Sequence, residues 1–275
     1  MVLRTPDSAA GAAGLAAILD RPREASLAFD FDGVLSPIVA DPGQSRPFPG
    51  MVAALGRLAE LVGSVSIITG RPVEAVLRLG DLGDLAALEH FAIFGLYGMQ
   101  RWDSASRSVV SEPVPPGVAA ARAELPALLD RPHLRGVAVE DKAMSVAVHT
   151  RRADEPHAAL EALREPLREL AGRHGLALEP GRMVLELRPP GVDKGHALEA
   201  IVGRHRARSV AYFGDDLGDL AAFDAVERLR EAGVAGLKVC SGSDEVPQLA
   251  ARADLIVDGP PGVLEFLEGL NERLK

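Results

Sequence analysis

Short apolar runs alternate with helical patterns along most of the chain, and this alternation predicts the fold class. Near-continuous apolar stretches of three to five residues are separated by segments whose apolar positions recur with helical spacing. Buried strands that alternate with helices indicate an α/β fold with a Rossmann-like parallel sheet covered on both faces. The predicted strands are 26–29, 65–69, 91–94, 209–213, 236–240 and 254–257, and the predicted helices are 51–61, 72–79, 194–206, 217–230 and 262–273.

The middle of the chain has a different pattern, in which pairs of strands are separated by single helices. From about Arg101 we predict a short hairpin, followed by helix 117–129, strands 136–140 and 143–149, helix 155–174, and strands 176–179 and 183–188. Pro-rich segments at 112–116 and 188–191 bracket this region as linkers would. We therefore predict a discontinuous core domain, 1–112 and 189–275, with an α+β domain, 113–188, inserted between its halves.

Composition and charge exclude several classes of protein. Hydrophobic residues make up 47% of the 275 residues and charged residues 25%, which is typical of a soluble globular protein. The net charge of −9 argues against a broad nucleic-acid-binding surface. Cys240 is the single cysteine, so a disulfide framework and a cysteine zinc site are excluded. The Ala-rich segment 9–19 predicts a first helix, and no apolar run approaches the length of roughly 20 residues that a membrane span needs. We expect a cytoplasmic protein that binds neither nucleic acid nor membrane.

Two carboxylates follow directly after the first predicted core strand. Asp30 and Asp32, with Gly33 next to them, lie where parallel sheets place their ligands. Asp30 could attack phosphorus as a nucleophile, and Asp32 could protonate the leaving oxygen and then deprotonate water. The alternative for this segment on its own is a strand followed by an Asp-rich turn.

A second acidic cluster follows the strand at 209–213. Asp215, Asp216 and Asp219 would repel one another unless a cation held them together. Oxygen ligands without His or Cys favour Mg²⁺. We predict Asp215 as a direct ligand, and Asp216 and Asp219 as ligands through water or as supports of the loop. For these last two, a solvated helix N-cap is the alternative.

Two further short motifs can contribute to the same site. Thr69, Gly70 and Arg71 close the second core strand, where a hydroxyl and an N–H could hold a phosphoryl oxygen, although a Thr-Gly turn is the structural alternative. Lys194 lies at the predicted start of a helix, against the preference of the helix dipole. A phosphate and nearby Asp residues would explain that position, whereas a lysine there on its own would be a surface residue.

In this order the four motifs resemble those of the haloacid dehalogenase superfamily, whose pattern is DxDGx, then a Ser or Thr, then a Lys, then GDDxxD. The resemblance implies an aspartyl-phosphate mechanism, with Mg²⁺ held by Asp30, Asp32 (through its backbone carbonyl), Asp215 and Asp216. Asp30 and Thr69 lie 39 positions apart, which a loop and a helix nearly fill. Thr69 and Lys194 lie 125 positions apart, so a lid of the C2 cap type belongs in this second gap.

Further strings are similar to those of the trehalose-6-phosphate phosphatase family from about residue 25 onward. They lie at 68–72, 95–100, 140–149 and 185–195. The resemblance implies that Glu140, Lys142 and Glu186 contact sugar hydroxyls, and that a trehalose-6-phosphate synthase is a functional partner. A salt bridge between strands is the alternative for Glu140 and Lys142, and an exposed strand carboxylate is the alternative for Glu186.

The chain departs from that family at three positions. Gly218 stands where a Thr is usual, Thr69 replaces the commoner Ser, and Gln100 stands where a Glu is common. None of these changes removes a predicted catalytic group. We therefore expect a Mg²⁺-dependent phosphatase that acts on a small sugar phosphate, trehalose 6-phosphate. The alternatives are a related phosphatase acting on sucrose phosphate or mannosyl-phosphoglycerate, and a non-catalytic module that senses a sugar phosphate.

Overall fold

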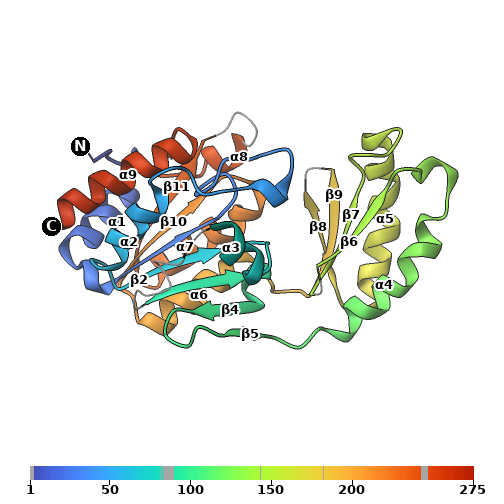
Figure 1. The fold of residues 1–275 in the computed structure, drawn as a ribbon, viewed down its shortest axis with the longest axis horizontal. Helices are drawn as coiled ribbons and strands as arrows, with labels where there is room; N and C mark the ends of the chain where they lie inside the picture. Colours follow the sequence, from blue (N-terminus) through green and yellow to red (C-terminus); the bar gives the residue numbers. More distant parts are fainter. Residues whose placement is uncertain (1–2, 81, 83–89, 143, 182, 243–246) are drawn as a thin grey trace. The chain divides into compact units, whose positions relative to one another are not determined.

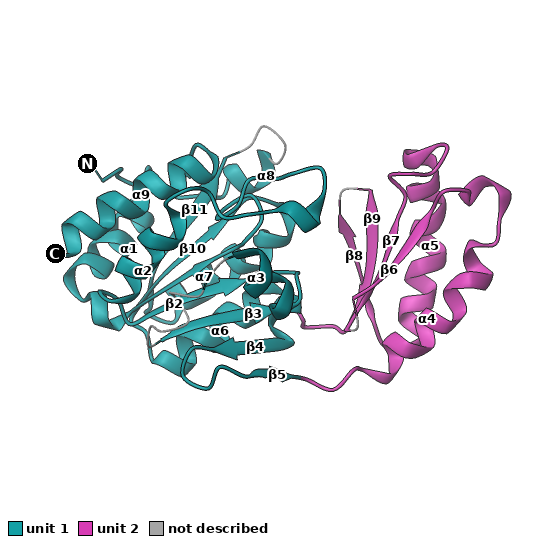
Figure 2. Cartoon of the chain, in the orientation of Figure 1, with its two compact units in different colours: residues 1–111, 193–275 teal, residues 112–192 magenta. Residues whose placement is uncertain are grey.

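The computed structural model describes residues 3–80, 82, 90–142, 144–181, 183–242 and 247–275. The chain divides into two compact units (Figure 2), unit 1 with residues 1–111 and 193–275, and unit 2 with residues 112–192. The chain therefore enters unit 2 within the first Pro-rich segment and leaves it just after the second. The predicted domains, 1–112 with 189–275 and 113–188, stay a prediction as independently folding pieces.

Unit 1 contains one eight-stranded sheet (Figure 1). Six neighbouring strands are parallel, and two more extend one edge in antiparallel pairing. In spatial order the strands are β12 (Leu255–Val257), β11 (Ala235–Ser241), β10 (Ser209–Gly214), β1 (Ala25–Phe29), β2 (Ser64–Ile68), β3 (Phe91–Gly95), β4 (Gln100–Asp103) and β5 (Val109–Ser111). From β1 to β3, successive strands are added toward one edge of the sheet, and from β10 to β12 they are added toward the other edge. The strand order therefore reverses between β1 and β10.

Helices bury both faces of this sheet, as the continuous apolar strands require. One apolar cluster includes side chains of α1 (Ala9–Asp20), α2 (Met51–Ala59), α3 (Val73–Gly80) and α9 (Gly259–Leu274). The other cluster includes side chains of α6 (Lys194–His205), α7 (Leu220–Glu231) and α8 (Pro247–Ala250). None of the helices in the described residues is long and apolar enough to cross a bilayer.

Unit 2 is an α+β layer. Its antiparallel sheet has the order β6 (Ala138–Asp141), β7 (Val146–His149), β9 (Val184–Arg188) and β8 (Ala177–Gly181). Apolar residues of α4 (Pro116–Leu129) and α5 (Pro156–Arg173) pack on β7 and β9 in a separate core. Pro180 lies in β8, which tolerates it because β8 is an edge strand.

The structure differs from the sequence predictions in several places. The hairpin predicted from about Arg101 is present as β4 and β5, and its two strands extend the core sheet within unit 1. The helix predicted at 217–230 begins as a 3₁₀ turn, because Asp216 and Asp219 cap that turn reciprocally. The last helix begins at Gly259, since Pro is tolerated in a first turn. The strand predicted at 143–149 starts at Val146, after a turn in which the Lys142 N–H donates to the Ser145 carbonyl; residue 143 lies outside the described residues.

Candidate active site

Three adjacent strands of unit 1 deliver the predicted chemistry to one edge of the sheet. Asp30 follows β1, Asp215 follows β10, and Thr69 follows β2. Because these strands are parallel neighbours, their carboxyl ends lie together. The reversal between β1 and β10 is a topological switch point, where open α/β sheets bind ligands. The topology therefore brings together residues that are distant in the sequence.

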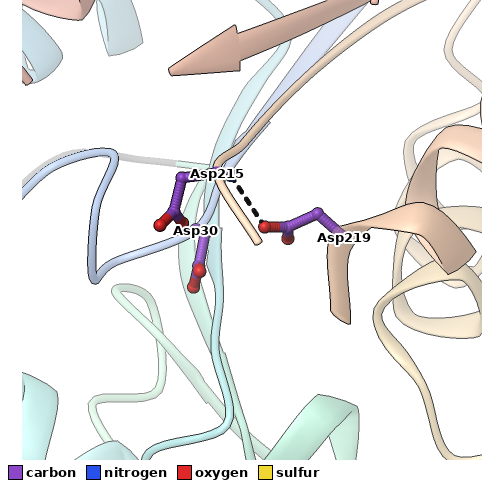
Figure 3. A group of neighbouring side chains, drawn as sticks. All are labelled: Asp30, Asp215 and Asp219. Carbon is purple, nitrogen blue, oxygen red and sulfur yellow. Dashed lines mark hydrogen bonds between the residues drawn. The ribbon is translucent and has the colours of Figure 1, made fainter. Parts of the chain in front are cut away.

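Three carboxylates converge at this point. One oxygen each from Asp30, Asp215 and Asp219 lie within 4.8 Å of one another, and all three residues are buried (Figure 3). The ammonium of Lys194 lies 2.8 Å from Oδ2 of Asp30 and 2.7 Å from Oδ1 of Asp219. Three carboxylates and one ammonium leave two negative charges, which a divalent cation would balance.

Lys194 is placed by the start of α6. Asp193 caps the helix by accepting a hydrogen bond from the His196 N–H, and Lys194 is the first helical residue. Its side chain is almost completely buried. Burial alone would lower the pKa of Lys194, but the charges of Asp219 and Asp30 raise it well above its ordinary value. Lys194 is therefore a fixed cation beside Asp30, and it is not the surface residue that the helix position on its own would indicate.

Asp219 supports the loop after β10. Its Oδ1 accepts from the Lys194 ammonium and from the Tyr212 hydroxyl at 2.6 Å, and its Oδ2 accepts from the N–H groups of Asp215 and Asp216. Although burial favours the protonated acid, Lys194 and these hydrogen bonds lower the pKa of Asp219. With four donors on two oxygens, its acceptor capacity is used within the protein.

Tyr212 was missed in the sequence analysis. It lies in β10, is completely buried, and donates its hydroxyl to Asp219. A signal was available, because a buried tyrosine usually needs a partner for its hydroxyl and acidic residues follow closely in the sequence.

Asp215 has the environment of a metal ligand. Its Oδ1 is buried and accepts no hydrogen bond within the described residues. Burial, together with the charges of Asp30, Asp219 and Asp216, raises the pKa of Asp215 to about 10. An unsatisfied carboxylate oxygen beside a second carboxylate fits a hard divalent cation such as Mg²⁺. The donor set of Asp30 and Asp215 thus agrees with the cation predicted from the sequence.

Asp216 does not belong to this cluster of three carboxylates. Its side chain is 59% exposed, its Oδ1 accepts from the Gly218 N–H, and the Lys194 ammonium lies 3.9 Å away. The capping role that the sequence analysis considered for Asp216 is therefore present. Its role as a metal ligand stays a prediction.

Asp32 is held by Arg71, from the loop after β2, and by Ser45, from further along its own connection between β1 and α2. Arg71 donates from Nε to Oδ2 at 2.6 Å and from Nη2 to Oδ1 at 2.7 Å. The Ser45 hydroxyl donates to Oδ1 at 3.0 Å. Sequence analysis had placed Arg71 with the phosphate-binding residues and had not considered Ser45, because a contact between side chains that are far apart in the sequence has no local sequence signal.

Thr69 is buried and suitably arranged to donate a hydrogen bond. Its Oγ1 accepts from the Arg71 N–H at 3.1 Å, which leaves the hydroxyl hydrogen to point elsewhere. At Gly70 a Cβ atom would lie 2.8 Å from the Tyr97 hydroxyl oxygen, so a side chain there would require Tyr97 to move. The close contact explains the glycine.

The three residues predicted to contact the sugar all lie in unit 2. Lys142 and Glu186 pair with each other, whereas Glu140 pairs with His149. Oε1 of Glu186 accepts from the Ser145 hydroxyl, and its Oε2 accepts from the Lys142 ammonium at 3.0 Å. Glu140 pairs instead with His149 at 2.8 Å. Glu186 is buried and Glu140 is exposed. The salt bridge considered as the alternative for Lys142 is present, with Glu186 as its partner.

Comparisons with known sequences agree with the motifs. A sequence profile described as trehalose-phosphatase matches residues 28–258. A trehalose-phosphate phosphatase of Mycolicibacterium paratuberculosis is 35% identical over 279 residues, which covers 96% of this chain and 65% of the relative. The corresponding Mycobacterium leprae protein is 33% identical, with 92% of this chain and 58% of the relative covered. The chain thus spans less than two thirds of the length of these relatives.

The fold is also similar to that of a solved structure. The C-terminal domain of Candida albicans trehalose-6-phosphate phosphatase aligns with a TM-score of 0.77 and 20% identity, covering 98% of this chain and 99% of that domain. At this identity the comparison establishes the fold, an α/β core with an inserted unit of the type predicted.

Proposed function

The chain belongs to the trehalose-phosphatase family, and from this premise we propose that it hydrolyses trehalose 6-phosphate to trehalose and phosphate. The observation that carries the proposal is the contact between Lys194 and Asp30 within the group of carboxylates at the switch point. A nucleophilic carboxylate beside a fixed cation is suited to a phosphoryl group, because attack on phosphorus concentrates negative charge there.

The first chemical step that we propose is attack of an Asp30 carboxylate oxygen on phosphorus. The bond from phosphorus to the sugar oxygen breaks, and an aspartyl-phosphate forms. Lys194 and the Thr69 hydroxyl, with the Gly70 N–H, stabilise the phosphoryl oxygens. Asp32 donates a proton to the departing sugar oxygen. In the second step Asp32 takes a proton from water, and the water oxygen attacks phosphorus. The bond between phosphorus and the Asp30 oxygen breaks, so that phosphate is released and the Asp30 carboxylate is regenerated.

Asp30 and Asp215 would hold Mg²⁺, with the backbone carbonyl of Asp32 and Asp216 as further candidate ligands. When bound, the cation supplies positive charge that stabilises the phosphoryl oxygens. Its support in this chain is the buried, unsatisfied Oδ1 of Asp215.

Residues of unit 2 provide the proposed specificity for the sugar. Lys142 can donate to a hydroxyl, and Glu186 and Glu140 can accept from one, through charge-assisted bonds. The hydrogen bonds of Glu186 to Lys142 and Ser145 support this proposal, because they hold a buried carboxylate in one orientation before any ligand binds. The substrate assignment therefore depends on unit 2, whereas the chemistry depends on unit 1.

The test is release of phosphate from trehalose 6-phosphate, sucrose phosphate, mannosyl-phosphoglycerate and glucose 6-phosphate, with and without Mg²⁺. We expect the highest kcat/KM for trehalose 6-phosphate and loss of turnover in EDTA. If sucrose phosphate were hydrolysed as fast as trehalose 6-phosphate or faster, the substrate assignment would be rejected, but the proposed mechanism would still stand.

Variants test the mechanism separately. Asp30→Asn should abolish turnover, whereas Asp224→Asn, which removes an exposed carboxylate paired with Arg252, should leave it unchanged. Full activity of Asp30→Asn would reject the proposed nucleophile. A non-catalytic sensing module is disfavoured because Asp30, Asp32, Lys194 and Asp215 are all present, and binding of trehalose 6-phosphate without turnover would favour it.

A further inference from the structure

Arg71 contacts the proposed acid and base Asp32 through two hydrogen bonds, and this geometry suggests a role other than phosphate binding. We propose that Arg71 is a positioning residue, which fixes the carboxyl group of Asp32 in the orientation needed to pass its proton to the leaving group and then, as the carboxylate, to take a proton from water. The inference rests on the proposed function, and it assigns to Arg71 an effect exerted through Asp32 and not through the phosphoryl oxygens.

Arg71 and Asp32 form a bidentate pair, which fixes both the distance between the guanidinium and the carboxylate and the plane in which they lie. Nε and Nη2 of Arg71 reach the two different oxygens of Asp32, at 2.6 and 2.7 Å. Two parallel bonds between planar groups restrict the rotation of the carboxylate, which a single bond would not do. The side chains of Arg71 and Asp32 are 17% and 37% exposed, so the pair is partly shielded from water.

The guanidinium is itself fixed from two sides. Nη1 of Arg71 donates to the Pro42 carbonyl at 2.8 Å, and the guanidinium carbon lies 5.7 Å from the centre of the Phe31 ring. Phe31 lies between Asp30 and Asp32 in the sequence, so the arginine packs against the segment that carries both carboxylates. A side chain held in this way can hold Asp32 at little further entropic cost.

A third donor completes the arrangement. The Ser45 hydroxyl donates to Oδ1 of Asp32, and its oxygen lies 2.6 Å from the Ser36 hydroxyl oxygen. Both serines are completely buried. Asp32 is thus held from the loop after β1 as well as from the loop after β2, and both oxygens of its carboxylate have a defined donor.

The geometry disfavours phosphate binding by the same guanidinium. A phosphoryl oxygen at Nε, or at the Nη2 N–H that faces Asp32, would displace the Asp32 carboxylate, and one N–H of Nη1 is used by the Pro42 carbonyl. If Arg71 acts through Asp32, its removal should slow only those steps in which Asp32 delivers or takes a proton.

Leaving-group basicity separates the two roles. A sugar alkoxide is a poor leaving group that needs a proton, whereas p-nitrophenolate leaves without one. For trehalose 6-phosphate we expect Asp32→Asn to lower kcat by about 100- to 10,000-fold. Arg71→Met should lower kcat by about 10- to 100-fold with little change in KM, which is the loss expected from a misplaced catalytic group. With p-nitrophenyl phosphate both losses should shrink to a fewfold in the first step, measured as the burst of p-nitrophenolate, whereas the second step still needs Asp32 to take a proton from water.

The decisive measurement is a double-mutant cycle with both substrates. In the Asp32→Asn background, Arg71→Met should cause no further loss of kcat. Arg71→Lys should restore only part of the activity, because an ammonium cannot form the bidentate pair. Arg46→Met is the matched control, since Arg46 is an exposed arginine of the same loop as Ser45 and donates to the backbone carbonyls of Gly43 and Ser45. It should retain wild-type kcat.

Four results would overturn the inference. Additive losses in the double variant, or a rise in KM with both substrates, would assign Arg71 to the phosphoryl group. A higher kcat for Arg71→Met would show that the pair inhibits the enzyme. Additive shifts of the urea unfolding midpoint in the same four proteins would show that the pair does not form in solution. Absence of hydrolysis of both esters by the wild type would instead reject the proposed function itself, and the catalytic role with it.

Discussion

The backbone of Gly33 lies directly against the carboxylate of Asp215, so that a Cβ atom at Gly33 would meet Oδ2 at 1.9 Å. The two motifs that carry the predicted chemistry are therefore in contact across the junction of β1 and β10. Gly33 also has a φ of +75°, a left-handed conformation that side chains rarely adopt.

Gly33→Ala should damage the site more than the fold. The new methyl group must displace the Asp215 carboxylate, and the backbone strain should lower the free energy of unfolding by about 1–3 kcal/mol. We expect kcat to fall on the order of 100-fold, because the carboxylates move apart. Gly203→Ala in α6 is the control, since nothing lies near its Cβ position; it should stabilise the protein by up to about 1 kcal/mol with unchanged kcat. Wild-type activity of Gly33→Ala would contradict the close contact.

Mg²⁺ should stabilise the wild-type protein through Asp215. A ligand that binds only the folded state adds about 2.7 kcal/mol at a concentration 100 times its Kd. Thermal unfolding with and without Mg²⁺ measures this effect independently of activity. Asp215→Asn should remove the Mg²⁺-dependent shift, whereas Asp224→Asn should retain it.

Without Mg²⁺, Asp215→Asn should be at least as stable as the wild type. Burial and the neighbouring carboxylates raise the pKa of Asp215 to about 10, so the charged form is disfavoured there and a neutral isostere relieves repulsion. A clear loss of stability in EDTA would indicate that Asp215 forms a structural bond.

Tyr212→Phe removes one of the four donors to Asp219 and leaves the ring in place. We expect a loss of about 1 kcal/mol in the free energy of unfolding, the usual contribution of one buried hydrogen bond. kcat should fall a fewfold with KM unchanged, because Lys194 and the N–H groups of Asp215 and Asp216 still hold Asp219. Urea unfolding and steady-state kinetics measure the two effects, and an unchanged stability would contradict the importance of the Tyr212 hydroxyl.

Cys240 should be unreactive in the folded protein. Burial, with the charges of Asp215 and Asp219, raises the pKa of the thiol to about 11. At pH 8 about one thiol in a thousand would be ionised, and only the thiolate reacts. Alkylation by iodoacetamide should be very slow until urea unfolds the chain. Rapid alkylation of the native protein at pH 8 would contradict the burial of Cys240.

The same pKa shift predicts a loss of stability at high pH. The folded-state pKa lies above that of an unfolded thiol, so this contribution to stability is fully present below about pH 8.5 and decreases as the pH rises toward 11. Cys240→Ser should weaken this dependence in unfolding measured between pH 8 and 11. An identical pH profile for the variant would assign the decrease to other groups.

Much of the fold could be predicted because local pattern and topology agree. Each parallel strand of unit 1 is mostly apolar and mostly buried, and parallel neighbours must end at the same edge. These two facts are sufficient to bring Asp30, Thr69 and Asp215 together. The start of α9 was predicted three residues late, because its first turn contains two prolines, which have no helical period of apolar positions but which a first helical turn accepts.

The partners of individual side chains could not be predicted in the same way. Arg71 was grouped with Thr69 because the two are neighbours in the sequence, yet its guanidinium contacts Asp32, 39 positions earlier. Such a contact depends on the conformation of the two loops and not on the period of a strand. Likewise, the sequence of 215–219 indicates that several carboxylates lie close together. Only the four donors around Asp219 show that Asp219 supports the loop and is not a metal ligand of the kind proposed for Asp215.

The central position of β1 has a consequence for synthesis of the protein. Ala25 of β1 pairs with Ser209 of β10, so one long edge of the central strand has no neighbour until residues 209–214 have left the ribosome. Unit 2 is contiguous and is complete before β10 is made. A nascent chain therefore carries an open, apolar strand edge while translation continues, and such an edge is a template for aggregation. The sheet that bears Asp30 closes only after β10 has been made.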